Sequence, residues 1–233
     1  MSIQREAGLV SIVVTSFNRE QYLDECLDSL IAQTYQNVEI ILIDDASSDN
    51  TMKVFEAFRS KVIKENDGMK DRITGIALPW NIGHEGATTF GMFLSRGEFI
   101  ALQDSDDLSH SKRIEREISF LKENPNVDMV GAQYAEFIDV KDGVLQGLSD
   151  ASNWMQYGDA ILEVYKKGWH CMAHGTLLFR AHAFDRLGGY TRNYGKAADY
   201  EFIRKFIMNG VKADNIPEVL YYYRRHHLQM SQQ

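Results

Sequence analysis

Short apolar stretches rich in β-branched side chains recur through the first 105 residues of the chain. The first, LVSIVVT at residues 9–15, is apolar on both faces, which is typical of a strand in a parallel sheet covered by helices on each side. Similar runs predict three further strands, at residues 38–43, 73–78 and 99–103. Apolar residues at helical spacing predict helices at residues 20–33, from Asp49 onward, and from the glycine-rich turn at 81–91 through Leu94.

Strands and helices therefore alternate, which is the pattern of a parallel sheet built by right-handed crossovers. In open α/β sheets of this kind, ligands bind beyond the carboxyl ends of the strands. Three polar clusters follow predicted strands, at residues 15–19, 44–48 and 104–107. We therefore expect three segments that are distant in the chain to meet along one edge of the sheet.

After residue 107 the pattern is mixed. Helices are expected at residues 111–123, 158–167, 181–187 and 197–209, and strands at residues 127–137, 144–148, 175–180 and 219–223. The pair Asp142-Gly143 predicts a hairpin turn before residues 144–148. Because strict alternation stops here, we expect this half to cover the edge of the sheet and to supply the pocket for a second substrate.

Charge, apolar runs and cysteine count argue against several classes of protein. The chain has 233 residues and a net charge of −8, which argues against a nucleic-acid partner. No apolar run approaches the roughly 18 residues of a membrane-spanning helix, and the N-terminus lacks a signal-peptide pattern. The two cysteines, Cys26 and Cys171, lie far apart, which favours a reducing compartment over a disulfide framework. We expect a cytoplasmic protein whose membrane contact is at most peripheral, at the inner face.

Three carboxylates, Asp104, Asp106 and Asp107, follow the predicted strand at residues 99–103. Carboxylates this close repel one another unless a cation neutralises them. Oxygen ligands of this kind suit Mg²⁺ or Mn²⁺, which complete their coordination with water and substrate phosphates. The alternative is that these residues cap the helix that starts near Ser111. Capping explains one such residue and not three, so we expect a metal that binds a diphosphate.

Five segments together resemble the inverting glycosyltransferases of family 2. They are VSIVVTSFNRE, IDDASSDNT, NIGHEGATTFG, DSD within LQDSDDL, and AADYEFIRK. No single segment is specific, but the ordered set is, and the resemblance covers roughly residues 9–227. It implies an α/β fold of the GT-A, nucleotide-diphospho-sugar transferase type, with a mainly parallel central sheet flanked by helices. It also implies one domain over residues 1–233, with a nucleotide-binding half at about 9–107 and an acceptor-binding half at about 108–233.

The resemblance also implies roles on the nucleotide side. Phe17 would stack on the base, and Asp45 would accept a hydrogen bond from the base imide, which suits uracil or thymine. Asp104 would contact the ribose hydroxyls. The expected nucleotide-binding residues are Thr15, Phe17, Arg19, Asp44, Asp45, Asn81, Asp104 and Ser105. Asn81 is also explained by turn chemistry alone. The NIGHEGATTFG turn has His84, Glu85 and Thr88 where many relatives place an Arg near the phosphates, so Arg19 or Arg224 would contact the diphosphate instead.

On the other side of the expected site, the resemblance makes Asp199 the catalytic base. Relatives commonly carry Glu immediately before this Asp, whereas this chain has Ala198, so Glu201 is the reserve candidate. A helix N-terminus also stabilises any Asp at that position. Asp106 would bind the Mn²⁺ or Mg²⁺ through one carboxylate oxygen, with His226 of the YRxH pattern as a further partner of the metal or diphosphate.

The remaining expected residues, Asp107, His174 and Arg224, belong to the acceptor or diphosphate side. His174 matches a recurring polar position in similar enzymes, and a half-buried, hydrogen-bonded histidine is the alternative. The segment WHCMAHG lacks the paired spacing of a structural zinc site. Arg224 is alternatively part of a solvated basic strand end.

The implied reaction is transfer of a sugar from a nucleotide-diphosphate donor, with a UDP-sugar favoured, to a hydroxyl of a glycan, lipid-linked or protein acceptor. A role in surface polysaccharide biosynthesis would follow. Two alternatives stay open. A sugar nucleotidyltransferase would carry a glycine-rich phosphate loop near the first strand, which SFNREQYLDE lacks. A GT-A domain that binds without catalysis is favoured only by Ala198.

Overall fold

The computed structural model describes residues 4–191, 197–227 and 229. The helices are α1 (Leu23–Ile31), α2 (Thr51–Glu65), α3 (His84–Leu94), α4 (Arg113–Glu123), α5 (Ala160–Lys166), α6 (Ala181–Leu187) and α7 (Ala198–Met208), with 3₁₀ turns η1 (Asp67–Met69) and η2 (His174–Thr176). The strands are β1 (Glu6–Ser16), β2 (Val38–Asp44), β3 (Ile73–Ala77), β4 (Gly97–Asp104), β5 (Leu108–Ser109), β6 (Met129–Phe137), β7 (Asp139–Lys141), β8 (Val144–Gln146), β9 (Leu178–Arg180) and β10 (Ala213–Arg224).

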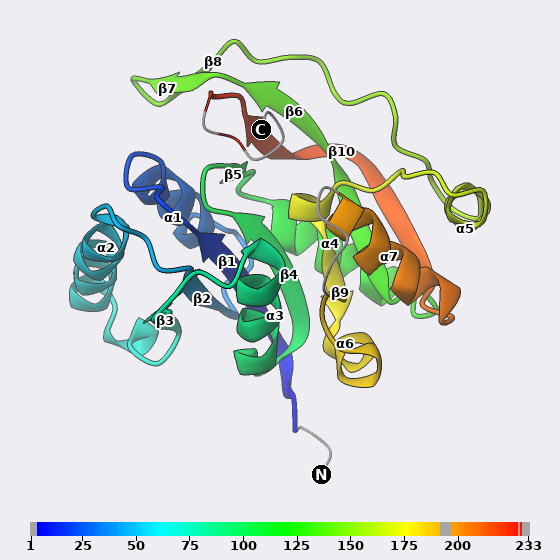
Figure 1. Cartoon of the computed structure of the whole chain (residues 1–233), viewed down its shortest axis with the longest axis horizontal. Coiled ribbons are helices and arrows are strands. Elements are labelled where there is room, and N and C mark those ends of the chain that lie inside the picture. Colours follow the sequence, from blue (N-terminus) through cyan, green and yellow to red (C-terminus); the bar gives the residue numbers. More distant parts are fainter. Residues whose placement is uncertain (1–3, 192–196, 228, 230–233) are drawn as a thin grey trace.

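A single large sheet runs through the described residues in the order β3-β2-β1-β4-β9-β6-β10-β5 (Figure 1). Its first four strands are all parallel, as predicted from the alternating pattern. β1 lies between β2 and β4, and it is apolar on both faces because both are covered. Val10, Ile12 and Val14 pack with α1, α2 and α4, whereas Val13 faces the cluster that includes α6 and α7.

The second half completes the sheet with mixed polarity, which confirms the predicted change of pattern. β9 runs antiparallel to β4 and β6, and β10 runs parallel to β6. The hairpin predicted at Asp142-Gly143 joins β7 to β8, with φ of 51° and 74° at the two turn residues. Positive φ at both positions is the requirement of a type I′ turn. Figure 1 shows this hairpin beyond the end of β6.

Several strand boundaries differ from the prediction, two of them for a clear physical reason. β10 begins at Ala213, well before the expected start at residue 219, and its register with β6 shifts between Ile216 and Val219. Pro217 lies in that shift, and a proline cannot donate to a strand ladder, which is why the sequence there does not read as a strand. The strand expected at residues 175–180 is shorter, because its first residues form the η2 turn.

Helix α3 lies unusually close to the sheet. An ideal Cβ at Gly91 would come within 2.5 Å of the Val13 side chain, so only glycine allows this approach without displacing the helix. Gly83 precedes α3 with φ of 85°, in the left-handed region that favours glycine. The two glycines therefore set the start of α3, and with it His84, above the carboxyl ends of β1 and β4. No helix in the described ranges is long and apolar enough to cross a membrane.

A buried ion pair ties α4 to the sheet behind the polar edge. Arg113 and Glu117 are both fully buried, with Nε of Arg113 3.2 Å from Oε1 of Glu117. Arg113 also donates to the Leu102 carbonyl at 2.9 Å and to Gln103 Oε1 at 3.0 Å, just before the three carboxylates. Burial raises the pKa of Glu117 from 4.5 to about 7, even though the neighbouring Arg113 lowers it.

The Glu117 carboxyl should make stability fall with rising pH. The folded state retains a proton that the unfolded chain releases above pH 4.5, so this contribution is present at low pH and is lost as pH rises through about 7. It amounts to at most about 3 kcal/mol. Glu117→Gln should therefore flatten the decline in unfolding free energy between pH 5 and 8, measured by denaturant titration. Glu123→Gln, an exposed change on the same helix, should leave the decline unchanged, and parallel curves for Glu117→Gln and wild type would contradict the assignment.

Candidate active site

The three polar clusters meet at one edge of the sheet, as expected from their positions after parallel strands. Thr15 on β1 pairs in register with Ile43 and with Asp104, and Ser16 pairs with Asp44. The backbone N–H of Asp45 donates to the Ser16 carbonyl at 2.8 Å. Segments nearly 90 residues apart in the chain therefore present their side chains side by side.

The loop after β2 is held by its own carboxylates. Asp45 is buried, and its two oxygens accept the backbone N–H groups of Ile82 at 2.7 Å and Gly83 at 2.9 Å. Asn81 donates to the Asp45 carbonyl at 3.1 Å, and its Oδ1 accepts the Gly83 backbone N–H at 3.2 Å, which is the turn chemistry given as the alternative for it. Asp44 accepts from Ser47, and burial raises its pKa. These contacts join the β2 loop to the turn before α3.

Phe17 and Ser105 differ in how far they are exposed to solvent. The Phe17 ring is 44% exposed at the edge of the sheet, where a flat ligand can reach it. Ser105 is 3% exposed in the turn that follows β4. Of these two expected nucleotide-binding residues, only Phe17 therefore presents a substantial surface to solvent.

Asp106 lies between two basic groups. Its Oδ2 accepts from Arg19 Nε at 2.9 Å and lies 2.9 Å from His226 Nε2. Burial alone would raise the pKa of Asp106, but the hydrogen bond to His226 and the charge of Arg19 outweigh it, and the pKa is lowered. The carboxylate is thus kept as an anion, with an imidazole nitrogen beside it. Asp106 and His226, the two expected metal partners, are direct neighbours.

Arg224 is buried beneath this loop, at 1% exposure. Its Nε donates to the Asp106 carbonyl at 2.8 Å, its backbone N–H donates to Asp107 Oδ1 at 2.7 Å, and its guanidinium pairs with Glu25. Asp107 is itself 1% exposed, and burial together with the charges of Asp106 and Asp104 raises its pKa well above the usual range. Arg224 therefore supports the loop of Asp106 and Asp107 from the protein interior, and Asp107 is buried within that loop.

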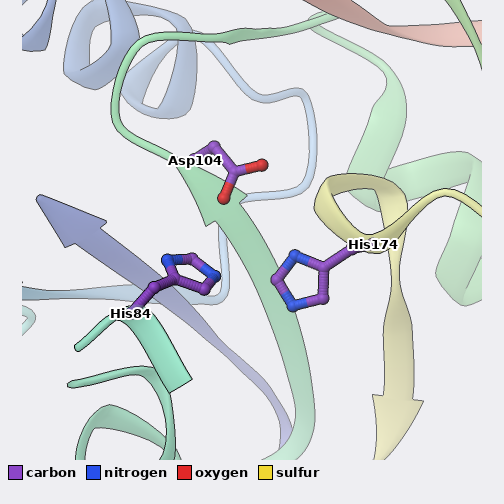
Figure 2. Close-up of side chains that lie close together, drawn as sticks. All are labelled: His84, Asp104 and His174. Atoms are coloured by element: carbon purple, nitrogen blue, oxygen red, sulfur yellow. The ribbon is translucent and has the colours of Figure 1, made fainter. Parts of the chain in front are cut away.

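Across the edge, His84, Asp104 and His174 face one another (Figure 2). A ring nitrogen of each histidine and a carboxylate oxygen of Asp104 all lie within 4.8 Å of one another. Burial raises the pKa of Asp104, while the charges of His174 and His84 lower it. The His84 Nδ1 lies 3.2 Å from the Thr15 hydroxyl, so this group also touches β1.

The η2 turn brings His174 to Asp104 because its middle residue is glycine. An ideal Cβ at Gly175 would lie 2.5 Å from the Tyr221 hydroxyl and 2.9 Å from Asp104 Oδ2, closer than a real side chain can approach. The spacing of the sequence offered no signal for this contact. His84 likewise follows a turn glycine and carried no role in the sequence prediction, although it supplies one of the three side chains of the group.

Asp199 adjoins this group from α7. Its Oδ1 lies 4.0 Å from His174 Nε2, and its side chain is 48% exposed. The hydroxyl of Tyr190 contacts the same His174 nitrogen. Ala198, where relatives commonly carry Glu, is buried. Of the two acidic residues in the first turn of α7, only Asp199 makes a described contact with His174.

Comparison with known proteins places this arrangement in a family. The family model described as Glycosyl transferase family 2 matches residues 11–188. The putative glycosyltransferase EpsE of Bacillus subtilis (strain 168) is 30% identical over 214 residues, covering 91% of this chain and 71% of EpsE. WfaP of Escherichia coli, a UDP-Glc:alpha-D-GlcNAc-diphosphoundecaprenol beta-1,3-glucosyltransferase, is 28% identical over 221 residues, covering 94% of this chain and 78% of WfaP.

Solved structures share the fold. S. aureus TarS 1–349 in complex with UDP-GlcNAc matches with a TM-score of 0.70 at 19% identity, over 96% of this chain and 61% of the TarS chain. Mannosyltransferase PcManGT from Pyrobaculum calidifontis, in complex with GDP-Man and Mn²⁺, matches with a TM-score of 0.68 at 20% identity, over 95% of this chain and 58% of that one. The chain thus spans about 60% of the length of these two solved chains. On the family match, with a GT-A fold in its solved neighbours, this chain belongs to glycosyltransferase family 2.

Proposed function

We propose that this chain is an inverting, metal-dependent hexosyltransferase that uses a nucleotide-diphosphate sugar, with a UDP-sugar favoured. The acceptor would be a hydroxyl of a glycan or a lipid-linked oligosaccharide, in surface polysaccharide biosynthesis. The observation that carries the proposal is the meeting of the β1, β2 and β4 loops with Asp199 of α7 at one sheet edge. The printed name of WfaP, with a UDP-linked donor and a lipid-linked acceptor, supports the same classes for this chain.

The nucleoside would bind between Phe17 and the Asp45 loop. The exposed Phe17 ring offers a face for stacking, which is worth about 1–3 kcal/mol per base in other proteins. Asp45 carboxylate oxygens already accept two backbone N–H groups, and each oxygen has a second lone pair for a base imide. An imide donor is present in uracil and thymine, which is why a UDP-sugar is favoured.

Asp106 and His226 would hold Mn²⁺ or Mg²⁺. The residues fit such an ion, because an anionic carboxylate and an imidazole nitrogen lie 2.9 Å apart, with Asp106 still 16% exposed. When bound, the ion would act as a Lewis acid that neutralises the departing diphosphate. Arg19, whose Nε contacts the same carboxylate, would add a positive charge beside that diphosphate.

Asp199 would take the proton of the acceptor hydroxyl. It is half exposed, so an acceptor can reach it, and His174 lies 4.0 Å away to orient it. As the proton moves to Asp199, the hydroxyl oxygen would form its bond to the anomeric carbon while the bond to the diphosphate oxygen breaks on the opposite face. One displacement inverts the anomeric configuration and requires no covalent enzyme intermediate.

The site of action we propose is the cytoplasm, with at most peripheral contact at the inner face of the membrane. Cys26 and Cys171 are both buried free thiols in the structure, which suits a reducing compartment. A lipid-linked acceptor would bring its hydroxyl to the enzyme from the membrane surface.

The donor class can be tested by thermal stabilisation. UDP-sugars should raise the melting temperature in the presence of Mn²⁺ and less so without it, because ligand binding to the folded state stabilises by about 2.7 kcal/mol at 100-fold excess over Kd. That corresponds to several degrees for a chain of this length. Differential scanning fluorimetry with UDP-, dTDP- and GDP-sugars measures this. Stabilisation by GDP-sugars alone would refute the role given to Asp45.

Metal dependence can be tested at Asp106. Asp106→Asn removes the negative charge that would bind the ion, and it should abolish both sugar transfer and donor hydrolysis with Mn²⁺. Asp142→Asn, at the exposed β7–β8 turn, is the matched control and should retain wild-type rates. The measurement is release of the nucleoside diphosphate from the donor. Full activity of Asp106→Asn would remove the metal from the proposal.

The catalytic base can be tested by comparing the two acidic residues of α7. Asp199→Asn should lower kcat by about 10²- to 10⁴-fold, the usual size of a general-base contribution. Donor binding should be unchanged, because Asp199 is not expected to contact the nucleotide. Glu201→Gln is the matched change two residues further along α7, and it should keep most of the activity. If the loss occurs in Glu201→Gln instead, the base is Glu201.

A further inference from the structure

Two histidines and a carboxylate from three separate elements converge at the centre of this edge. His84 begins α3, Asp104 ends β4, and His174 begins η2. Their candidate ligand atoms all lie within 4.8 Å of one another. Figure 2 shows the two imidazole rings facing each other with the Asp104 carboxylate beside the gap between them. This set is different from Asp106 and His226, which carry the proposed Mn²⁺ or Mg²⁺.

Each histidine also makes the contact that metal-bound histidines usually make through their second nitrogen. His84 Nδ1 lies 3.2 Å from the Thr15 hydroxyl, which leaves Nε2 toward the gap. His174 Nε2 contacts the Tyr190 hydroxyl, which leaves Nδ1 toward Asp104. In metal sites such outer contacts fix the ring orientation and the tautomer. These contacts therefore fix both rings, and each ring presents its other nitrogen toward the gap beside Asp104.

Electrostatics favour a cation at this position. Asp104 shares the edge with the carboxylates of Asp106 and Asp199, and the negative charges of these groups repel one another. A divalent ion would offset that repulsion. Access is open, because Asp104 and His84 are only partly buried, whereas His174 is 8% exposed.

We propose that His84, Asp104 and His174 bind a divalent transition-metal ion of the zinc class. Two nitrogen ligands and one oxygen ligand suit Zn²⁺ or Co²⁺ better than Mg²⁺, which prefers oxygen alone. Three protein ligands leave a further coordination position open to solvent or substrate. The ion would join α3 and β4 of the first half of the chain to η2 of the second half. Binding of the ion requires neither donor nor acceptor, so it does not rest on the proposed reaction.

The test is binding of Zn²⁺ to the full, metal-stripped chain without nucleotide, by isothermal titration calorimetry. The visible absorption of bound Co²⁺ reports on the coordinating atoms as a second readout. Wild type should bind one equivalent. His84→Asn should weaken Zn²⁺ binding at least tenfold, by comparison with the 10- to 100-fold losses seen when a mere outer contact is removed. His182→Asn is the matched control, because that side chain is 64% exposed and its Nε2 lies 3.4 Å from Asp128 instead of in the group of His84, Asp104 and His174, and it should bind as wild type does.

Further variants separate this site from the proposed Asp106 site. Asp106→Asn should keep the Zn²⁺ equivalent, and His174→Gln should lose it. Circular dichroism and melting curves check that each variant is folded, and His84 is the safer change because it is partly exposed. The proposal is overturned if wild type binds no Zn²⁺, if His84→Asn binds it as tightly as wild type, or if Asp106→Asn abolishes it. In the first two cases the metal-dependent transfer assigned to Asp106 would be unaffected.

Discussion

Three carboxylates crowd the end of β4, and much of the surrounding structure serves to hold them there. Each is stabilised in its own way. Asp106 is kept as an anion by Arg19 and His226, whose favourable contacts exceed the cost of burial. Asp107 is buried, and burial together with the charges of Asp106 and Asp104 raises its pKa well above the usual range. Asp104 faces two imidazoles. The three carboxylates therefore lie in different local environments, which reduces the repulsion expected of such a cluster.

Arg224 shows how the fold supports that loop from behind. Its guanidinium and backbone contact Asp106 and Asp107, its outer nitrogen pairs with Glu25, and it packs over the ring of Tyr22 with 4.9 Å between the guanidinium carbon and the ring centroid. A guanidinium so fully engaged and 1% exposed fits a positioning role better than contact with a diphosphate. Of the two arginines expected near the diphosphate, Arg19 is therefore the one whose side chain contacts the Asp106 carboxylate.

The sequence predicted the sheet edge because that edge depends on local patterns. A strand such as β1, apolar on both faces, must lie inside a parallel sheet, and its polar successor must then fall at the carboxyl edge. Asp106 and His226 were paired by resemblance, and the structure makes them neighbours. The approach of His174 to Asp104 could not be read in the same way. It depends on β9 running antiparallel beside β4 and on the absence of a side chain at Gly175, and both are tertiary facts without a periodic signal.

One of the two histidines replaces a positive charge that the family resemblance leads us to expect. The turn before α3 lacks the Arg that many relatives carry, and His84 lies there instead, against Thr15. An imidazole differs from a guanidinium in that its neutral form can donate a lone pair to a metal, whereas a guanidinium stays protonated and cannot. With histidine in place of arginine, this edge therefore loses a permanent positive charge and gains a nitrogen that can bind a metal. With His174 opposite, this edge offers nitrogen ligands near Asp104 and a carboxylate with one imidazole at Asp106, so ions of different softness would separate between the two positions.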